Sequence, residues 1–167
     1  DTVVLPAGNG TLLLGSLKGF GELLEAGLIE RIPAHVAVQS GACAPVAAVF
    51  EGHETAESAL GMENGSTVAE GIAISQPSLL GRMVDGVRSS GGRVITVSED
   101  EIRGALRRAV RGGLYIEPTA AASLAGLEKY AGKAPEEETI VGVVTGHGLK
   151  APGKIAGLLE EQEEALP

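Results

Sequence analysis

The sequence predicts an α/β protein with an open, mostly parallel β-sheet and helices on both faces. Short apolar runs alternate with longer stretches of helical periodicity along the 167 residues, and such alternation is typical of parallel strands joined by helical crossovers. The composition agrees: 44% of the residues are hydrophobic, only 2% are aromatic, and 25 are glycine, which favours closely packed layers and tight turns. We expect one α/β domain across residues 1–167, because no long linker interrupts the pattern.

The first predicted unit is a strand, a helix and a second strand. Residues 3–5 form an apolar run typical of a strand, and residues 12–26 carry apolar side chains that can share one broad helical face. Gly27 is a suitable helix end. Residues 36–39, of which 36–38 are apolar, are predicted to be the second strand.

The next part of the chain is less regular. A short helix is expected over residues 44–50, because proline at position 45 is tolerated in a first helical turn. Residues 51–66 lose their periodicity and are rich in Gly, Glu, Asn and Ser, so we interpret them as a possible flexible excursion. Helical periodicity returns at residues 77–90 and ends at two consecutive glycines.

A clear helix start follows the third predicted strand, residues 94–97. Ser98 and Glu101 have the spacing of a capping box, in which each side chain accepts a hydrogen bond from the backbone of the other residue. This pattern predicts a helix that runs to about Arg111.

The last part of the chain continues the alternation. A short strand is predicted at residues 114–116, and Thr119 is expected to cap a helix that ends at Ala131. Residues 140–145 form an apolar run typical of a strand at the centre of a parallel sheet. A final helix with an exposed acidic end is expected after Pro152.

The charge and the cysteine content narrow the possible partners. A net charge of −9 argues against nucleic acid or an anionic membrane as a partner, although backbone amides could still bind an anion locally. Cys43 is the single cysteine, so we expect no internal disulfide and a reducing, cytoplasmic location. The sequence has no apolar run of membrane-spanning length and no signal-peptide pattern.

The most informative stretch is the glycine-rich turn Gly8, Asn9, Gly10 and Thr11, between the first strand and the first helix. Glycines let the main chain approach an anion closely, and a helix start offers unpaired N–H groups and the positive end of its dipole. Asn9 tolerates left-handed backbone and brings an amide donor. By itself the turn predicts either a phosphate cradle or a simple strand-to-helix connection.

Three polar or glycine-rich loops each follow a predicted strand: residues 7–11, 117–122 and 145–150. Ligands of open α/β sheets bind outside the carboxyl ends of the strands. We therefore expect the three loops to lie along one edge of the sheet and to share one ligand. This convergence supports a cofactor site better than any single motif does.

The residues of these loops carry a family resemblance. Pro-Ala-Gly-Asn-Gly at 6–10, Glu-Pro-Thr-Ala-Ala-Ala-Ser at 117–123 and Thr-Gly-His-Gly-Leu-Lys at 145–150 occur in this order, together with Gly-Phe at 19–20, Gly-Leu-Ile at 27–29 and Val-Gln at 38–39. Over essentially the whole chain, this set resembles the carboxy-terminal portion of threonine synthase. That family consists of pyridoxal-phosphate enzymes of fold type II, the fold of the tryptophan synthase β subunit. The block at 145–150 is the most specific part of the resemblance.

The resemblance implies roles for six residues in binding pyridoxal 5′-phosphate. Gly8, Asn9, Gly10 and Thr11 would hold the cofactor phosphate. Thr145 would place a neutral hydroxyl at the pyridine nitrogen, which moderates the electron sink of the ring, or it would bond to local backbone. Glu117 would either line the cofactor ring or cap the helix that follows it.

Two further residues of the loop at 145–150 are candidates with simpler roles. His147 lies between glycines and is interpreted as a loop-shaping hydrogen bonder rather than a general base. Lys150 is interpreted as a solvated charge.

The chain departs from the family pattern in two ways. The phosphate loop of the family reads Gly-Asn-x-Gly-Asn, whereas Thr11 and Leu12 stand at its fourth and fifth positions here; this leaves the amino-acid substrate open. In addition, none of the lysines lies in the Schiff-base motif of the family, which precedes the phosphate loop. The lysines are Lys18, Lys129, Lys133, Lys150 and Lys154.

The resemblance therefore implies an enzyme that converts O-phosphohomoserine to threonine and phosphate, of which this chain is a cofactor-binding fragment. The chain alone is expected to be inactive without the catalytic lysine. Expected partners are a small phosphorylated amino-acid substrate, the amino-terminal segment of the same enzyme and, in a homodimer, a second copy. The alternatives are a related pyridoxal-phosphate lyase or dehydratase, and a non-catalytic α/β module that binds a phosphorylated metabolite.

Overall fold

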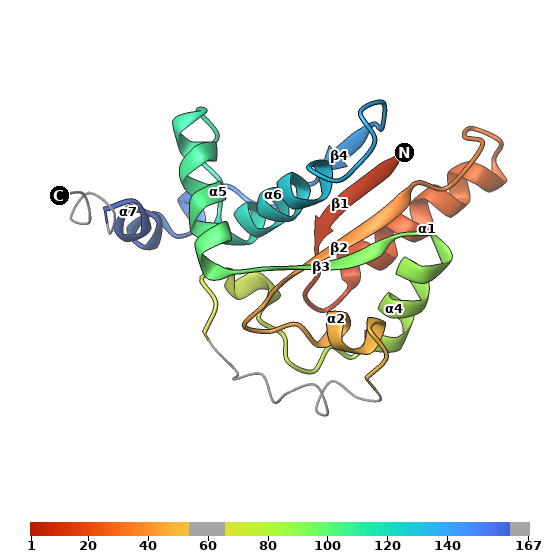
Figure 1. The fold of residues 1–167 in the computed structure, drawn as a ribbon, viewed down its shortest axis with the longest axis horizontal. Coiled ribbons are helices and arrows are strands. Elements are labelled where there is room, and N and C mark those ends of the chain that lie inside the picture. Colours follow the sequence, from red (N-terminus) through yellow and green to blue (C-terminus); the bar gives the residue numbers. More distant parts are fainter. Residues whose placement is uncertain (54–65, 161–167) are drawn as a thin grey trace.

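A computed structural model describes residues 1–53 and 66–160. Its sheet contains four strands in the order β3-β2-β1-β4, and every neighbouring pair is parallel (Figure 1). The strands are β1 (Thr2–Pro6), β2 (Ala34–Ser40), β3 (Arg93–Val97) and β4 (Ile140–Gly142). The predicted parallel sheet is confirmed.

Helices cover both faces of this sheet, as the sequence predicts. One face carries α1 (Thr11–Glu25), α2 (Pro45–Phe50) and α4 (Leu80–Ser89), and the other carries α5 (Glu99–Arg111) and α6 (Pro118–Ala131) (Figure 1). The helix α7 (Pro152–Glu160) and the short 3₁₀ helices η1 (Glu70–Ile72) and η2 (Gly148–Lys150) complete the described elements.

Alternating strand residues build a separate core on each face. Val4, Val36 and Val38 pack toward α5 and α6, whereas Leu5 and Ala37 pack toward α1, α2 and α4. This is the period-two pattern of a sheet buried on both sides. The two cores hold the carboxyl ends of β1 and β2 in place, and the functional loops start there.

The predicted capping box at the start of α5 is confirmed. The Glu101 N–H donates to Ser98 Oγ at 3.2 Å, and the Ser98 N–H donates to Glu101 Oε2 at 2.7 Å. Both bonds satisfy backbone donors that a helix start leaves without intrahelical partners.

Three predictions about the last part of the chain are wrong. Residues 114–116 do not form a strand; among them only Ile116 makes an isolated antiparallel bridge, to His147. The strand predicted at residues 140–145 ends at Gly142 and lies at the sheet edge, where Val141 is 54% exposed. An apolar run reports hydrophobicity, which does not distinguish an edge strand from a central one.

Thr119 is also not the cap of α6. The N-cap position belongs to Glu117, and Pro118 occupies the first helical turn, so Thr119 lies inside the helix. The fixed φ of proline suits a first helical position, and this places the helix start earlier than a threonine cap would.

Two predicted features lie wholly or largely outside the described residues. They are the flexible excursion at 51–66, of which 54–65 are not described, and the acidic end of the last helix, within 161–167. In the parts of the chain that the structure does describe, every helix is too short or too polar to cross a membrane.

Candidate functional site

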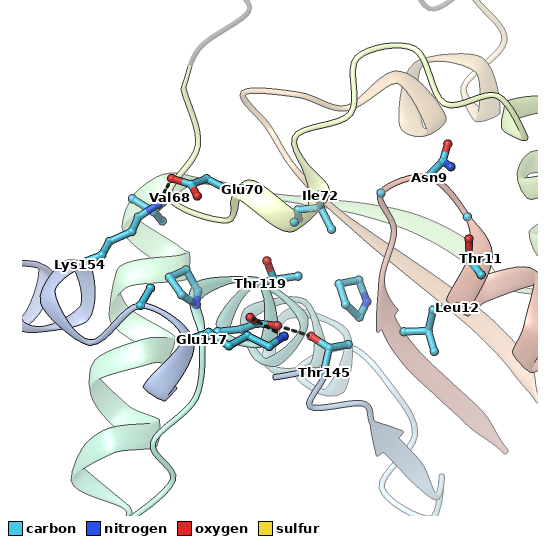
Figure 2. A pocket seen from close by; sticks show the side chains of 17 residues that line it. Asn9, Thr11, Leu12, Val68, Glu70, Ile72, Glu117, Thr119, Thr145 and Lys154 are labelled. Atoms are coloured by element: carbon cyan, nitrogen blue, oxygen red, sulfur yellow. Dashed lines mark hydrogen bonds and ion pairs between the residues drawn. The ribbon is translucent and has the colours of Figure 1, made fainter. Parts of the chain in front are cut away.

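A pocket of about 490 Å³ opens at the carboxyl edge of the sheet (Figure 2). Its walls are the loop after β1, the η1 segment, the start of α6, the segment after β4 and the start of α7. The chain passes from β1 to β2 and β3 on one side and returns to β4 on the other. The pocket therefore lies where the strand order reverses, which is the usual ligand position in open α/β sheets.

All six residues that the sequence analysis singled out line this pocket: Gly8, Asn9, Gly10, Thr11, Glu117 and Thr145. The expected convergence of three distant loops is thus observed. The same pocket also contains residues that the sequence analysis did not select, chiefly Glu70 and Lys154.

The start of α1 offers free backbone donors to the pocket. Gly10 is the N-cap, with φ 93°, and no side chain caps the helix. The first intrahelical bond runs from the Leu14 N–H to the Gly10 carbonyl. The N–H groups of Thr11, Leu12 and Leu13 therefore have no acceptor within the helix. These groups and the helix dipole form an anion-binding arrangement.

The two glycines of the loop are required for different reasons. A Cβ at Gly8 would lie 2.7 Å from the Gly71 carbonyl oxygen, so the loop packs directly against η1. A Cβ at Gly10 would lie 2.6 Å from Met83 Sδ, and the positive φ of Gly10 also disfavours other residues. A side chain at either position would displace the loop.

Asn9 is anchored through its oxygen. Asn9 Oδ1 accepts hydrogen bonds from the Ser78 N–H and the Ser78 hydroxyl, both at 3.3 Å. This leaves the amide NH₂ as the part of the side chain that can donate to a ligand. The contact also ties the loop to the segment that precedes α4.

Glu117 is the central polar residue of the pocket (Figure 2). Its side chain is 17% exposed and forms a 3.1 Å ion pair with Lys150. The Thr145 hydroxyl donates to Glu117 Oε1 at 3.4 Å. Glu117 occupies the N-cap position of α6, but its side chain makes no hydrogen bond to the helix start. Its carboxylate lines the pocket instead. The Lys150 side chain is 63% exposed, as expected of a solvated charge, but it is also paired with Glu117.

The loop after β4 is shaped to fit Glu117. The Glu117 N–H donates to the Gly146 carbonyl at 3.0 Å, and a Cβ at Gly146 would overlap the Glu117 carboxylate. His147 Nδ1 accepts the Leu149 N–H at 3.2 Å, and its ring packs edge-on against Tyr115. His147 therefore shapes the loop, as the sequence analysis expected.

The charged side chains of the pocket cancel. Lys154 pairs with Glu70 across the mouth, where it joins α7 to η1 (Figure 2), and this contact lowers the pKa of Glu70. Lys150 likewise pairs with Glu117. The attraction for an anion must therefore come mainly from backbone N–H groups. Among the described residues, no cluster of three or more His, Cys, Asp or Glu side chains could hold a metal ion.

Comparisons with known proteins identify the class. Residues 1–146 match the profile of the pyridoxal-phosphate dependent enzyme family. The chain belongs to this family.

The curated relatives are more specific. The chain is 33% identical over 164 residues to threonine synthase from Methanocaldococcus jannaschii and 35% identical over 165 residues to threonine synthase from Methanosarcina acetivorans. Each alignment covers 96% of this chain and 40% of the relative. The chain thus spans about 40% of the length of these relatives.

Solved structures share the fold. Maize serine racemase superposes with a TM-score of 0.66 at 20% identity, covering 99% of this chain and 47% of that one. Serine racemase from Dictyostelium discoideum superposes with a TM-score of 0.61 at 22% identity, covering 89% and 43%. These matches confirm the predicted fold type.

Proposed function

We propose that this chain is the cofactor-binding portion of a threonine-synthase-like enzyme and that the pocket binds pyridoxal 5′-phosphate. The observation that carries the proposal is an uncapped helix start, reached through a tightly packed glycine loop, in the same pocket as Thr145 and Glu117. The family match and the threonine synthase relatives support the same cofactor.

The residues present suit the parts of this cofactor. The phosphate would lie at the start of α1, on the N–H groups of the loop and the Thr11 hydroxyl. Glycine at positions 8 and 10 lets the loop pack against its neighbours, because a Cβ would meet the Gly71 carbonyl at position 8 and the Met83 side chain at position 10. Thr145 would place its hydroxyl at the ring nitrogen, and Glu117 would line the ring.

The bound cofactor would supply an electron sink for the substrate carbon. The neutral hydroxyl of Thr145 would leave the ring nitrogen largely unprotonated, which moderates this sink. The Thr145 hydroxyl, which donates to Glu117 in this structure, would turn to donate to the ring nitrogen instead, while the ion pair with Lys150 would keep the Glu117 carboxylate in place.

We further propose that the catalytic lysine belongs to another segment of the same enzyme and that these 167 residues alone are inactive. Lys150 and Lys154, the two lysines of the pocket, are both held in ion pairs. Neither lies in a segment that resembles the Schiff-base motif of the family. The shorter span of this chain relative to threonine synthases supports the proposal.

O-phosphohomoserine is the substrate that the relatives favour, and threonine and phosphate would be the products. Both relatives are threonine synthases, at 33–35% identity. Thr11 and Leu12 stand where the phosphate loop of the family has glycine and asparagine. This difference favours a second possibility, a related pyridoxal-phosphate lyase or dehydratase with another amino-acid substrate. Product analysis of the full-length enzyme with O-phosphohomoserine, serine and threonine would separate the two.

The phosphate cradle can be tested with two matched glycine substitutions. Gly8→Ala places a methyl group against the Gly71 carbonyl, whereas Gly15→Ala adds one on α1 where no atom lies within 4 Å. Binding of inorganic phosphate, followed through backbone amide shifts, should be of millimolar order in the unmodified chain. Gly8→Ala should weaken it about tenfold, equivalent to about 1.4 kcal/mol.

The control substitution should leave phosphate affinity unchanged, because Gly15 lies on an open helix surface. Equal affinities for the two variants, or phosphate-dependent shifts that avoid residues 8–12, would contradict the proposed cradle.

A further inference from the structure

We propose that Gln39 is the positioning residue of the phosphate loop: its amide fixes the Ala7 carbonyl and thereby sets the direction of the N–H groups that follow. The inference rests on the proposed function of that loop. Gln39 is not among the residues that line the pocket, so it would act through the loop rather than on a ligand.

The amide of Gln39 makes three hydrogen bonds in a fully buried position. Its Nε2 donates to the Ala7 carbonyl at 3.0 Å, and its Oε1 accepts from the Val46 N–H at 2.9 Å and the Ala47 N–H at 3.1 Å. One side chain at the end of β2 therefore joins the phosphate loop to the start of α2.

The start of α2 depends on this side chain. Ala44 occupies the N-cap position and offers no side-chain acceptor. Gln39 Oε1 takes over the role of a cap from a neighbouring strand, because it accepts from two of the helix donors that lack intrahelical partners.

Both backbone groups of Ala7 are fixed by β2. The Ala7 N–H donates to the Val38 carbonyl at 2.9 Å, and the Ala7 carbonyl accepts from Gln39. Ala7 is the last residue before Gly8, so this pair of bonds orients the peptide planes that lead into the cradle. Gly8 then passes beside Gly71 without room for a Cβ.

The two sides need one side chain that carries both a donor and an acceptor, as an amide does. The Ala7 carbonyl needs a donor, and the two α2 N–H groups need an acceptor. A carboxylate could accept from α2, but its second oxygen would face the Ala7 carbonyl oxygen and repel it. A protonated carboxyl restores the pattern, since its O–H can donate to Ala7 while its carbonyl accepts from α2.

This chemistry allows a test that separates positioning from stability. In Gln39→Glu, burial should raise the pKa of the new carboxyl, so that the variant mimics glutamine at pH 5.5 and not at pH 8. Phosphate affinity should be close to that of the unmodified chain at pH 5.5 and about tenfold weaker at pH 8. The unmodified chain, measured at each pH, removes the effect of phosphate ionisation itself.

Two further variants complete the design. Gln39→Met keeps the length of the side chain but loses all three bonds, and it should weaken phosphate binding at both pH values. His35→Gln is the control: His35 is fully buried at the other end of β2 and bonded to Ser16 and Pro33. It should lower the unfolding temperature without weakening phosphate binding.

Amide hydrogen exchange of residues 8–10 without any ligand provides a second readout. At pH 8, the amides of residues 8–10 should exchange faster in Gln39→Glu than in either the unmodified chain or His35→Gln. If the unmodified chain fails to bind phosphate, the proposed function fails, and the exchange measurement still decides whether Gln39 orders the loop. Unchanged affinity and exchange in Gln39→Glu at pH 8, or an equal loss of affinity in His35→Gln, would overturn the inference.

Discussion

His35 illustrates how burial of one residue fixes its charge. The ring is fully buried in β2, with Nδ1 2.8 Å from the Pro33 carbonyl and Nε2 2.8 Å from Ser16 Oγ. A carbonyl can only accept, so Nδ1 carries a proton, and Nε2 of the neutral ring accepts from the Ser16 hydroxyl. Burial lowers the pKa of His35, and the bond to Pro33 opposes this only in part.

The lowered pKa predicts that acid destabilises the fold. The unfolded chain binds a proton below the ordinary histidine pKa of about 6.5, while the folded chain resists it. The stabilisation from His35 should be complete above pH 6.5 and decline as the pH falls from there toward the folded pKa. His35→Gln should remove this part of the slope in the free energy of urea unfolding measured between pH 7.5 and 5. An unchanged slope in the variant would exclude His35 as its source.

At the scale of single elements, local patterns were readable from the sequence. Ser98 and Glu101 define the start of α5 through their own side chains, and the glycine turn at residues 8–11 leads directly into α1. In both cases the residues that decide the structure lie within a few positions of one another. Short, largely apolar runs likewise identified β1, β2 and β3.

Features that depend on distant residues could not be read in this way. The need for glycine at position 8 comes from Gly71, and the place of Lys150 comes from Glu117. The role of Gln39 was missed because its partners, Ala7 and the start of α2, are brought together only by the fold. The available signal was an amide side chain directly after the apolar run of residues 36–38.

The elements that carry the pocket lysines lead to a prediction about covalent modification. Lys150 in η2 and Lys154 in α7 are tied to Glu117 and Glu70, and an amine must leave such a contact before it can attack the cofactor aldehyde. After incubation with pyridoxal 5′-phosphate and borohydride reduction, peptide mapping should find no preferential label on either. Lys133, exposed just after α6, serves as the internal reference.

Labelling of Lys150 or Lys154 at one equivalent per chain, well above the level at Lys133, would show that the chain supplies its own attachment site. The proposal that another segment provides the catalytic lysine would then be wrong.

At the scale of the whole molecule, the sheet order explains why the site forms where it does. β1 lies between β2 and β4, and the chain crosses one face of the sheet to reach β2 and the other to reach β4. The connections leaving β1 and following β4 therefore separate at the carboxyl edge, and the pocket lies between them (Figure 2). Because of this reversal, residues as far apart in the sequence as Gly8 and Lys154 line the same pocket.

The central claim is that this pocket holds pyridoxal 5′-phosphate with its phosphate at the start of α1. The most direct measurement is an amide-shift titration of the chain with pyridoxal 5′-phosphate, repeated with pyridoxal, which lacks the phosphate. We expect saturable shifts at residues 8–12, at Glu117 and at Thr145 with the phosphorylated compound, and much weaker binding of pyridoxal. Equal binding of the two compounds, or saturable shifts that leave residues 8–12 unmoved, would contradict the claim.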